Sequence, residues 1–449
     1  MYVPELPEAE PRLRSRYKLL LVAHLSPAQR LAAGLHPPPS VSKPFAAVQA
    51  AWRFFANDKV TLPQLAGPMV QCAGEEMGTA CDDYGLVMMD WCQLHLNGHR
   101  SLEDRVELAH QNDLGYEMLS SLLVSDRDGS PIAPLGLEVR SKQGIHSTRS
   151  KKVLAEMSQL DGLSPLMEEA ETHGLGKPLV FILDAEADSV AHYRQWESLG
   201  RQFLVRADAQ RSVLCDGRER LLGQVADELK AQGKLQATLQ IDYKGKKAWT
   251  YVGETQVVLH RPARPHRVGS DGKKRHRNVP GPAITLRLIV SQVRDSTGQV
   301  LARWLLLSNL PPGVDPARLA QWYYWRWRIE SYHKLLKGAG HFIEQWQQES
   351  APALAKRLAI ASMACVIVWR LARDQSPAAA ELRDLLVRLS GRQIKRGKDK
   401  RPFTEPALLA GLGILLPMLC LLQQHRPDEL LKIIQAALPT VIQFGNDSG

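Results

Sequence analysis

A single carboxylate, Glu330, stands among basic and aromatic side chains in the stretch WRWRIESYHKLLKG, residues 325–338. On a helix, which turns by about 100° per residue, residues at intervals of three, four and seven share one face. Four polar residues of this segment meet that spacing: Tyr323, Arg326, Glu330 and Lys337. Such a row could hold a metal ion against a phosphate group. The alternative is a surface helix with ion pairs, such as Glu330 with Lys334.

Two further carboxylates follow short apolar runs. Asp90 follows LVMM at 86–89, and Asp184 follows LVFIL at 179–183. Such runs are typical of strands buried on both faces of a sheet. Acids at the ends of adjacent strands converge at one edge of the sheet. With Glu330 from a packed helix they would form a site for two Mg²⁺ ions, because hard cations take oxygen ligands.

Other interpretations of these acids stay open. An isolated Asp after a strand is often a helix cap or a turn residue. Asp82 and Asp83 are the neighbouring alternatives to Asp90, and Asp188 is the alternative to Asp184, one helical turn further on.

The elements that must position these residues suggest an α/β chain. Residues 120–141 are predicted to form a hairpin with Asp-Gly at its turn, and a helix is expected across roughly 150–173. The stretches 235–243 and 284–290 alternate apolar and polar residues, as half-buried antiparallel strands do. We therefore expect five regions: a helical N-terminal region at 1–75, the first part of the core at 76–211, an all-β insertion at 212–308, the helix that carries Glu330 and the end of the core at 309–375, and a helical C-terminal region for possible dimerisation at 376–449.

Composition favours an anionic partner. The 57 basic and 47 acidic residues leave a formal net charge of +10. The basic segments 261–277 and 392–402 are predicted to add salt-sensitive DNA affinity. The six cysteines show no paired spacing, which predicts reduced thiols in a cytosolic protein, and no signal peptide is evident. The apolar runs 358–369 and 406–422 are predicted as buried helices or an oligomer interface rather than membrane spans, the first being too short to span a bilayer.

Several motifs resemble the bacterial cut-and-paste DDE transposases of insertion sequence family four. The spacing Tyr-(2)-Arg-(3)-Glu-(6)-Lys is that family's signature, and the chain is similar to the transposon Tn-five type of enzyme. By this resemblance the N-terminal region at 1–75 would bind DNA, and the helix that carries Glu330 would be the catalytic helix. Weaker similarities run from about residue 45 to 345. They include LDAEAD at 183–188, AAWRFFANDKVTLPQL at 50–65, and WLLLSN at 304–309.

The resemblance implies an RNase H-like mixed-sheet core with an all-β domain inserted between the second Asp and the Glu. Asp90, Asp184 and Glu330 would then be the catalytic residues and hold two Mg²⁺ ions, with Mn²⁺ as a substitute. Trp304 matches a position whose indole stacks on a flipped base at the transposon end. The residues expected to contact DNA are Tyr323, Arg326, Lys337, Trp304, Arg206 and Lys334.

The activity that the resemblance implies is cut-and-paste transposition of an insertion sequence. Metal-dependent strand cleavage with a hairpin intermediate would be followed by strand transfer, and the enzyme would act as an endonuclease on double-stranded transposon ends and target DNA. We expect a homodimer in a synaptic complex, no membrane partner, and a bacterial cytoplasmic location at the nucleoid. The alternatives are an RNase H-like nuclease without strand joining, which has no use for Trp304, and a catalytically inactive DNA-binding relic.

Overall fold

The chain divides into two compact units, each described here by itself. The computed structural model describes residues 6–25, 44–151, 159–264, 266–268, 274–276, 278–392 and 402–437. Most of the two basic segments predicted to bind DNA therefore lies outside the described residues. Unit 1 comprises Met1–Leu65, Leu96–Glu103 and Lys334–Gly449, and unit 2 comprises Ala66–His95 and Asp104–His333.

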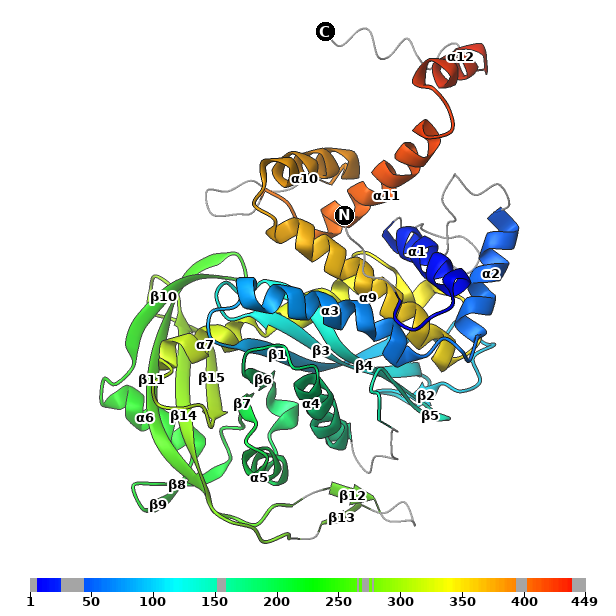
Figure 1. Cartoon of the computed structure of the whole chain (residues 1–449). Helices are drawn as coiled ribbons and strands as arrows, with labels where there is room; N and C mark the ends of the chain where they lie inside the picture. Colours follow the sequence, from blue (N-terminus) through cyan, green and yellow to red (C-terminus); the bar gives the residue numbers. More distant parts are fainter. Residues whose placement is uncertain are drawn as a thin grey trace. The chain divides into compact units, whose positions relative to one another are not determined.

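Unit 2 is built on a large mixed sheet with helices beside it, which confirms the mixed α/β class (Figure 1). The main strand order is β5-β4-β3-β1-β6-β7-β15-β14-β11-β8-β9, with β10 beside β11 and β2 beside β3. The strands are β1 Gly85–His95, β2 Val106–Glu107, β3 Leu114–Ser125, β4 Pro131–Ser141, β5 Gly144–Ser147, β6 Leu179–Leu183, β7 Gln202–Arg206, β8 Ser212–Cys215, β9 Arg218–Leu221, β10 Gln236–Tyr243, β11 Lys246–Leu259, β14 Ile284–Arg294 and β15 Val300–Ser308. A separate pair is β12 His266–Val268 with β13 Lys274–His276.

The two predicted apolar strands are adjacent and parallel. β1 pairs with β6 from Gly85 to Met88, while β3 pairs antiparallel along the other edge of β1. Asp184 directly follows β6, as predicted, but Asp90 does not end its strand. β1 continues to His95 because β3 still pairs with it there. Met88 of β1 pairs with Ile182 of β6, and each of them lies two positions before an acid, Asp90 or Asp184. The two acids are therefore at the same position along the paired strands.

The predicted hairpin at 120–141 is confirmed by the antiparallel pairing of β3 with β4. The expectation of an all-β insertion at 212–308 is wrong in one respect, because Leu222–Ala231 forms helix α6. This helix buries Leu222, Val225 and Leu229 on one side, so its apolar residues recur at helical spacing. The strands of this region also extend the same sheet, since β15 pairs with β7.

Helices cover the sheet of unit 2. In Figure 1, α4 (Leu163–Thr172) and α5 (Val190–Ser198) lie together below β6 and β7, and α3 (Leu62–Ala80) lies above. The indole Nε1 of Trp196 on α5 donates to Ser164 Oγ on α4 at 2.9 Å. Helix α4 falls within the predicted 150–173 stretch, of which residues 152–158 are outside the described part.

The predicted catalytic helix is interrupted. Helix α7 (Pro316–Trp325) ends at Arg326, and α8 (Trp327–Leu336) begins directly after it. Backbone bonds from Arg326 N to Tyr323 O and from Ile329 N to Arg326 O span three residues, so the chain tightens there. Lys337 lies just beyond α8 rather than on it. The apolar face that the spacing predicts is nevertheless buried: Trp325, Ile329, Tyr332 and Leu336.

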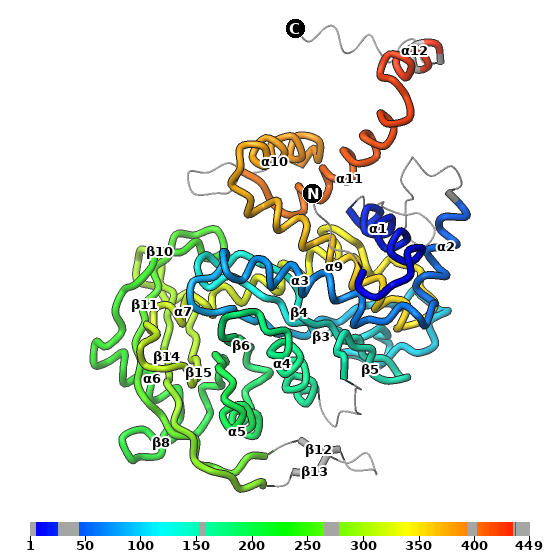
Figure 2. Tube along the Cα trace, in the orientation of Figure 1, coloured from blue at the N-terminus to red at the C-terminus, as the bar shows by residue number. Residues whose placement is uncertain are grey.

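Unit 1 is helical and joins the two ends of the chain. Its helices are α1 Pro11–Leu25, α2 Pro44–Ala56, α9 Ala351–Arg373, α10 Pro377–Ser390, α11 Glu405–Leu422 and α12 Pro427–Ala437. Figure 2 shows α1 and α2 beside α9, and they contact it. Lys356 Nζ on α9 donates to Asn57 O at 2.9 Å. The N-terminal and C-terminal helical regions, predicted as separate parts, therefore share one core.

Two helices of the described chain are long and apolar enough to cross a membrane. Helix α9, with 23 residues, extends beyond the predicted run 358–369 and is long enough to span a bilayer, but 94% of its apolar window is buried. It is a core helix. Helix α11 is 28% buried over its window. Its first half packs on α10, and its second half exposes Ile414, Met418, Leu419, Leu421 and Leu422.

Candidate active site

Arg326 joins two of the predicted metal-binding carboxylates. Its Nη1 donates to Asp90 Oδ2 at 3.0 Å, and its Nη2 donates to Glu330 Oε1 at 3.2 Å. The side chain of Arg326 is 9% exposed and that of Asp90 is 13% exposed. Glu330 is 31% exposed. One guanidinium therefore ties strand β1 to the start of helix α8, and it does so at an edge that solvent can reach.

Asp184 completes the group. It follows β6, and its Oδ1 accepts a hydrogen bond from Glu186 N at 2.9 Å, which caps the short helix Ala185–Ala187. The alternative reading of Asp184 as a cap is thus correct for one oxygen. Its charge also acts on Asp90, whose pKa it raises. The three acids predicted from separate motifs therefore face a common region.

The carboxylates of this region repel one another. Burial raises the pKa of Asp90 to about 7, assisted by the charges of Asp184 and Glu330 and opposed by Arg326. The Arg326 guanidinium thus bonds two of these carboxylates, while the charge of Asp184 acts on Asp90. Like charges held together disfavour the ionised form, and a bound cation would relieve that repulsion.

The donor set fits a hard divalent cation. All three side chains offer carboxylate oxygens, which are the ligands that Mg²⁺ prefers. Among the described residues, no three His, Cys, Asp or Glu side chains stand close enough to form a complete metal-binding group. At this site the Arg326 guanidinium lies between the Asp90 and Glu330 carboxylates and bonds both of them.

An aromatic cluster borders the carboxylates. Burial raises the pKa of the Tyr323 phenol, while the charges of Arg326 and Arg206 lower it, so both predicted phosphate contacts lie near this ring. The ring of Tyr323 lies 5.6 Å from that of Trp304 on β15. The sequence prediction missed two further members, Tyr243 and Tyr324, whose rings each lie 6.4 Å from Trp304. Aromatic residues close to the signature motif were the available signal for Tyr324, but the β10–β11 turn that brings Tyr243 had none.

The two predicted DNA-binding lysines belong to unit 1. Lys334 is exposed on α8. Lys337 follows that helix, and its Nζ pairs with Glu344 Oε1 at 3.0 Å.

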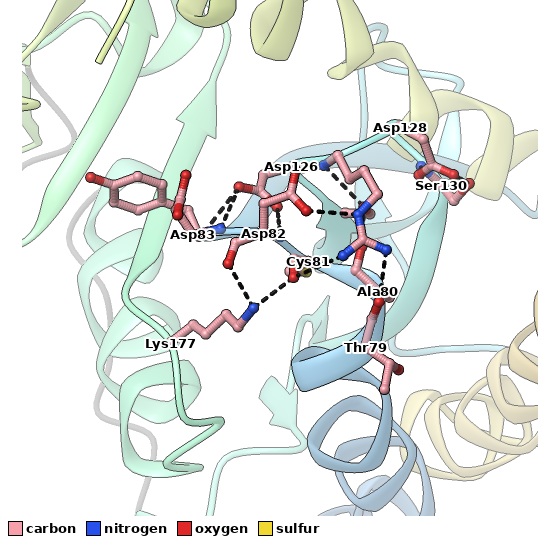
Figure 3. Close-up of polar contacts among 12 residues, drawn as sticks. Thr79, Ala80, Cys81, Asp82, Asp83, Asp126, Asp128, Ser130 and Lys177 are labelled. Atoms are coloured by element: carbon pink, nitrogen blue, oxygen red, sulfur yellow. Dashed lines mark hydrogen bonds and ion pairs between the residues drawn. The ribbon is translucent and has the colours of Figure 1, made fainter. Parts of the chain in front are cut away.

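The alternative acids have other partners. Asp188 accepts from Tyr193 Oη at 2.7 Å and from Arg211 Nε at 2.9 Å, and it is 4% exposed. Asp82 and Asp83 precede β1, at the far end of that strand from Asp90. There their backbone N–H groups donate to the carboxylate of Asp126, as Figure 3 shows. These acids hold loops together, which separates them from the group around Arg326.

One buried contact next to the site had no sequence signal. Ser120 Oγ on β3 and His333 Nε2 on α8 are 2.7 Å apart. His333 lies within the 325–338 segment but not at one of its signature positions, and the contact arises only when β3 and α8 come together.

Comparison with known proteins found no matching family model and no similar curated sequence. The resemblance to DDE transposases therefore rests on the motifs of this chain and on the arrangement described above.

Proposed function

We propose that this chain is a DDE transposase that carries out cut-and-paste DNA transposition on an RNase H-like core. The observation that carries the proposal is the meeting of Asp90, Asp184 and Glu330 around Arg326. Two of these acids come from adjacent parallel strands and the third from a helix far along the chain. This arrangement is what the signature spacing and the strand-end acids predict together.

The strand order supports the RNase H-like part of the proposal. In the run β4-β3-β1-β6-β7, β3 is antiparallel to β1, and β6 and β7 are parallel to it. Such a sheet sets Asp90, within β1, beside Asp184 at the end of β6, and open α/β sheets place their ligands at this edge.

The side chains suit phosphodiester chemistry. Asp90, Asp184 and Glu330 would hold Mg²⁺, which when bound supplies Lewis-acid polarisation and a more acidic water. Arg326 presents a planar guanidinium that can contact a phosphate through two N–H groups once a cation takes over its carboxylates. Arg206 is exposed and lies near Tyr323, in position for a second phosphate. Trp304 offers a half-buried ring for base stacking.

Two DNA ends require two active sites, so we also propose a homodimer that works in the bacterial cytoplasm. The apolar residues exposed on the second half of α11 are the candidate contact. This assembly is a consequence of the proposed reaction, because both ends must be cut and joined together.

The test is cleavage of a DNA duplex that carries the sequences flanking the coding region, with Mg²⁺ or Mn²⁺. Wild type is compared with Glu330→Gln and with Glu349→Gln, a control that removes the charge of an exposed glutamate outside the site. We expect wild type and the control to release the end through a hairpin. Glu330→Gln should bind the same DNA without cutting it.

Two other results would replace the proposal. Cleavage without hairpin formation or strand joining would indicate an RNase H-like nuclease. Equal DNA binding by all three proteins, with no cleavage in either metal, would indicate a DNA-binding protein without catalysis.

A further inference from the structure

We propose that the hydrogen bond between Ser120 and His333 is a brace that positions Glu330 relative to Asp90. The contact joins strand β3 to helix α8 at 2.7 Å. Ser120 is 0% exposed and His333 is 7% exposed. This inference rests on the proposed function for its consequences, but the brace itself is defined by the contacts of unit 2.

Ser120 stands directly beside Asp90 in the sheet. The two residues are Cα partners in the antiparallel pairing of β1 with β3. Residues opposite each other in such a pair project their side chains to the same face of the sheet. The Ser120 hydroxyl is therefore fixed by the same pairing that fixes the Asp90 carboxylate.

The helix side of the contact has matching geometry. Arg326, Glu330 and His333 are separated by intervals of four and three, so they share one helix face. Arg326 bonds Asp90 on β1 at 3.0 Å, and His333 bonds Ser120 on β3 at 2.7 Å. Glu330 lies between these two attachments, one turn from each.

Two attachments restrain a helix better than one. With Arg326 alone, α8 could pivot about the Arg326–Asp90 bond, and Glu330 would move along the sheet. Moreover, Arg326 must release Asp90 and Glu330 when a cation binds them, whereas Ser120 and His333 carry no such conflict. The brace therefore keeps α8 in place at the step when the Arg326 contacts are lost.

The chemistry of the pair suits this role. A serine hydroxyl both donates and accepts, so it can bond either tautomer of a neutral imidazole. Neither side chain contacts a reacting atom in this arrangement, which makes both positioning residues. Partners behind a metal ligand typically contribute about 10–100-fold to metal affinity or activity.

The test uses a serine pair that the strand provides. Ser120→Ala removes the hydroxyl of the brace. Ser121→Ala removes the hydroxyl of the next residue, which is equally buried, points to the other face and lies 3.5 Å from Gly136 O. His333→Gln keeps a side-chain amide able to bond Ser120. Each protein is assayed for thermal stabilisation by Mg²⁺, amide hydrogen exchange in residues 328–333, and cleavage of end DNA.

For Ser120→Ala we expect faster amide exchange in α8, an increase of about tenfold in the Mg²⁺ concentration for half-maximal stabilisation, and cleavage about 10–100-fold slower. Ser121→Ala should match wild type in the Mg²⁺ midpoint and in exchange, whatever its melting temperature. His333→Gln should stay close to wild type in all three measurements.

The brace is overturned if Ser120→Ala and Ser121→Ala show the same exchange in α8 and the same Mg²⁺ midpoint. Failure of the proposed function has a different signature, because wild type itself would show neither stabilisation by Mg²⁺ nor cleavage. Amide exchange then decides alone: unchanged exchange in Ser120→Ala overturns the brace, and faster exchange retains it as the link that holds α8 to β3.

Discussion

Two arginines on neighbouring helical segments gather carboxylates in opposite ways. Arg318, on α7, donates to Asp126 Oδ2 at 2.8 Å and to Asp83 Oδ2 at 2.9 Å. The Asp126 carboxylate is fully buried and also accepts the backbone N–H groups of Asp82 and Asp83 (Figure 3). It accepts the N–H of Tyr84 as well. Arg326 contacts Asp90 and Glu330, with Asp184 near enough to act on Asp90.

The difference lies in how the negative charge is compensated. Asp126 is surrounded by N–H donors, so the oxygens of this buried carboxylate are satisfied by hydrogen bonds. Asp90 is buried near two other acids, and its pKa rises to about 7. The first cluster fastens the connection between α3 and β1, whereas the second retains unbalanced charge at a solvent-accessible edge. Perturbed groups of this kind are characteristic of functional sites.

The largest expected effect is on the rate of end cleavage, which should depend on the cluster around Arg326 and not on the cluster around Arg318. Asp90→Asn should lower the rate of end cleavage at least about a thousandfold, since losing a metal ligand removes several kcal/mol of transition-state stabilisation. Asp83→Asn, which changes a 62% exposed acid bonded to Arg318, should cleave at the wild-type rate. Single-turnover cleavage measures both. Similar losses in the two variants would abolish the distinction.

The next effect is on the free energy of unfolding, which should depend strongly on the cluster around Arg318. Asp126→Ala should lower the free energy of unfolding by about 3 kcal/mol, because it leaves Arg318 and three backbone N–H groups without their buried acceptor. Asp128→Ala should have a smaller effect, since that exposed acid bonds only Ser130 in the contacts of the described chain. Urea unfolding monitored by circular dichroism provides the comparison, and equal midpoints for the two variants would contradict it.

The third effect is the pH dependence of stability without metal. The pKa of Asp90 is about 7 in the folded chain and near 3.8 ordinarily. Between these values the folded state holds more protons, so Asp90 makes stability fall as pH rises through that window. We expect Asp90→Asn to match wild type near pH 4 and to exceed it at pH 8 in EDTA by about 4 kcal/mol, since the pKa is raised by about three units and each unit is worth about 1.4 kcal/mol.

Urea unfolding at the two pH values measures this difference, with Asp83→Asn as the control. An advantage of Asp90→Asn that is the same at pH 4 and pH 8 would show that the cluster around Arg326 is not strained by charge.

The smallest effect concerns the aromatic rings beside the two arginines. Trp322 is fully buried under Arg318, at 5.2 Å from its guanidinium, whereas Trp304 is half-buried beside Tyr323. Trp304→Ala should slow hairpin formation about tenfold, because base stacking on an aromatic ring contributes about 1–3 kcal/mol. Trp304→Tyr should recover most of that rate. Unchanged hairpin kinetics in Trp304→Ala would assign this ring to packing alone.

Local sequence patterns predicted the individual elements well. The runs before Asp90 and Asp184 form strands because continuous apolar segments are buried on both faces of a sheet. The hairpin at 120–141 formed around its Asp-Gly turn, and the apolar face opposite Glu330 was buried as its spacing required. In each case the pattern spans a few neighbouring residues, where periodicity and turn chemistry act directly.

The positions where strands and helices begin and end were harder to predict. β1 extends past Asp90 because β3 pairs with it as far as His95. No sequence feature near Asp90 indicates that pairing. Helix α6 appeared in a region that was expected to be all-β. Similarly, the predicted catalytic helix is interrupted at Arg326, where the sequence has no Gly or Pro that would have indicated a break.

The sequence by itself indicated the three acids, because the spacing around Glu330 and the apolar runs before Asp90 and Asp184 are local properties of the chain. Only the tertiary structure decided their surroundings. It gave Asp126 three backbone N–H donors but Asp90 one, that of Trp91, inserted Arg326 between Asp90 and Glu330, and brought Ser120 to His333. Burial, charge coupling and hydrogen bonding depend on groups that meet from distant segments, so their balance exists only in the folded chain.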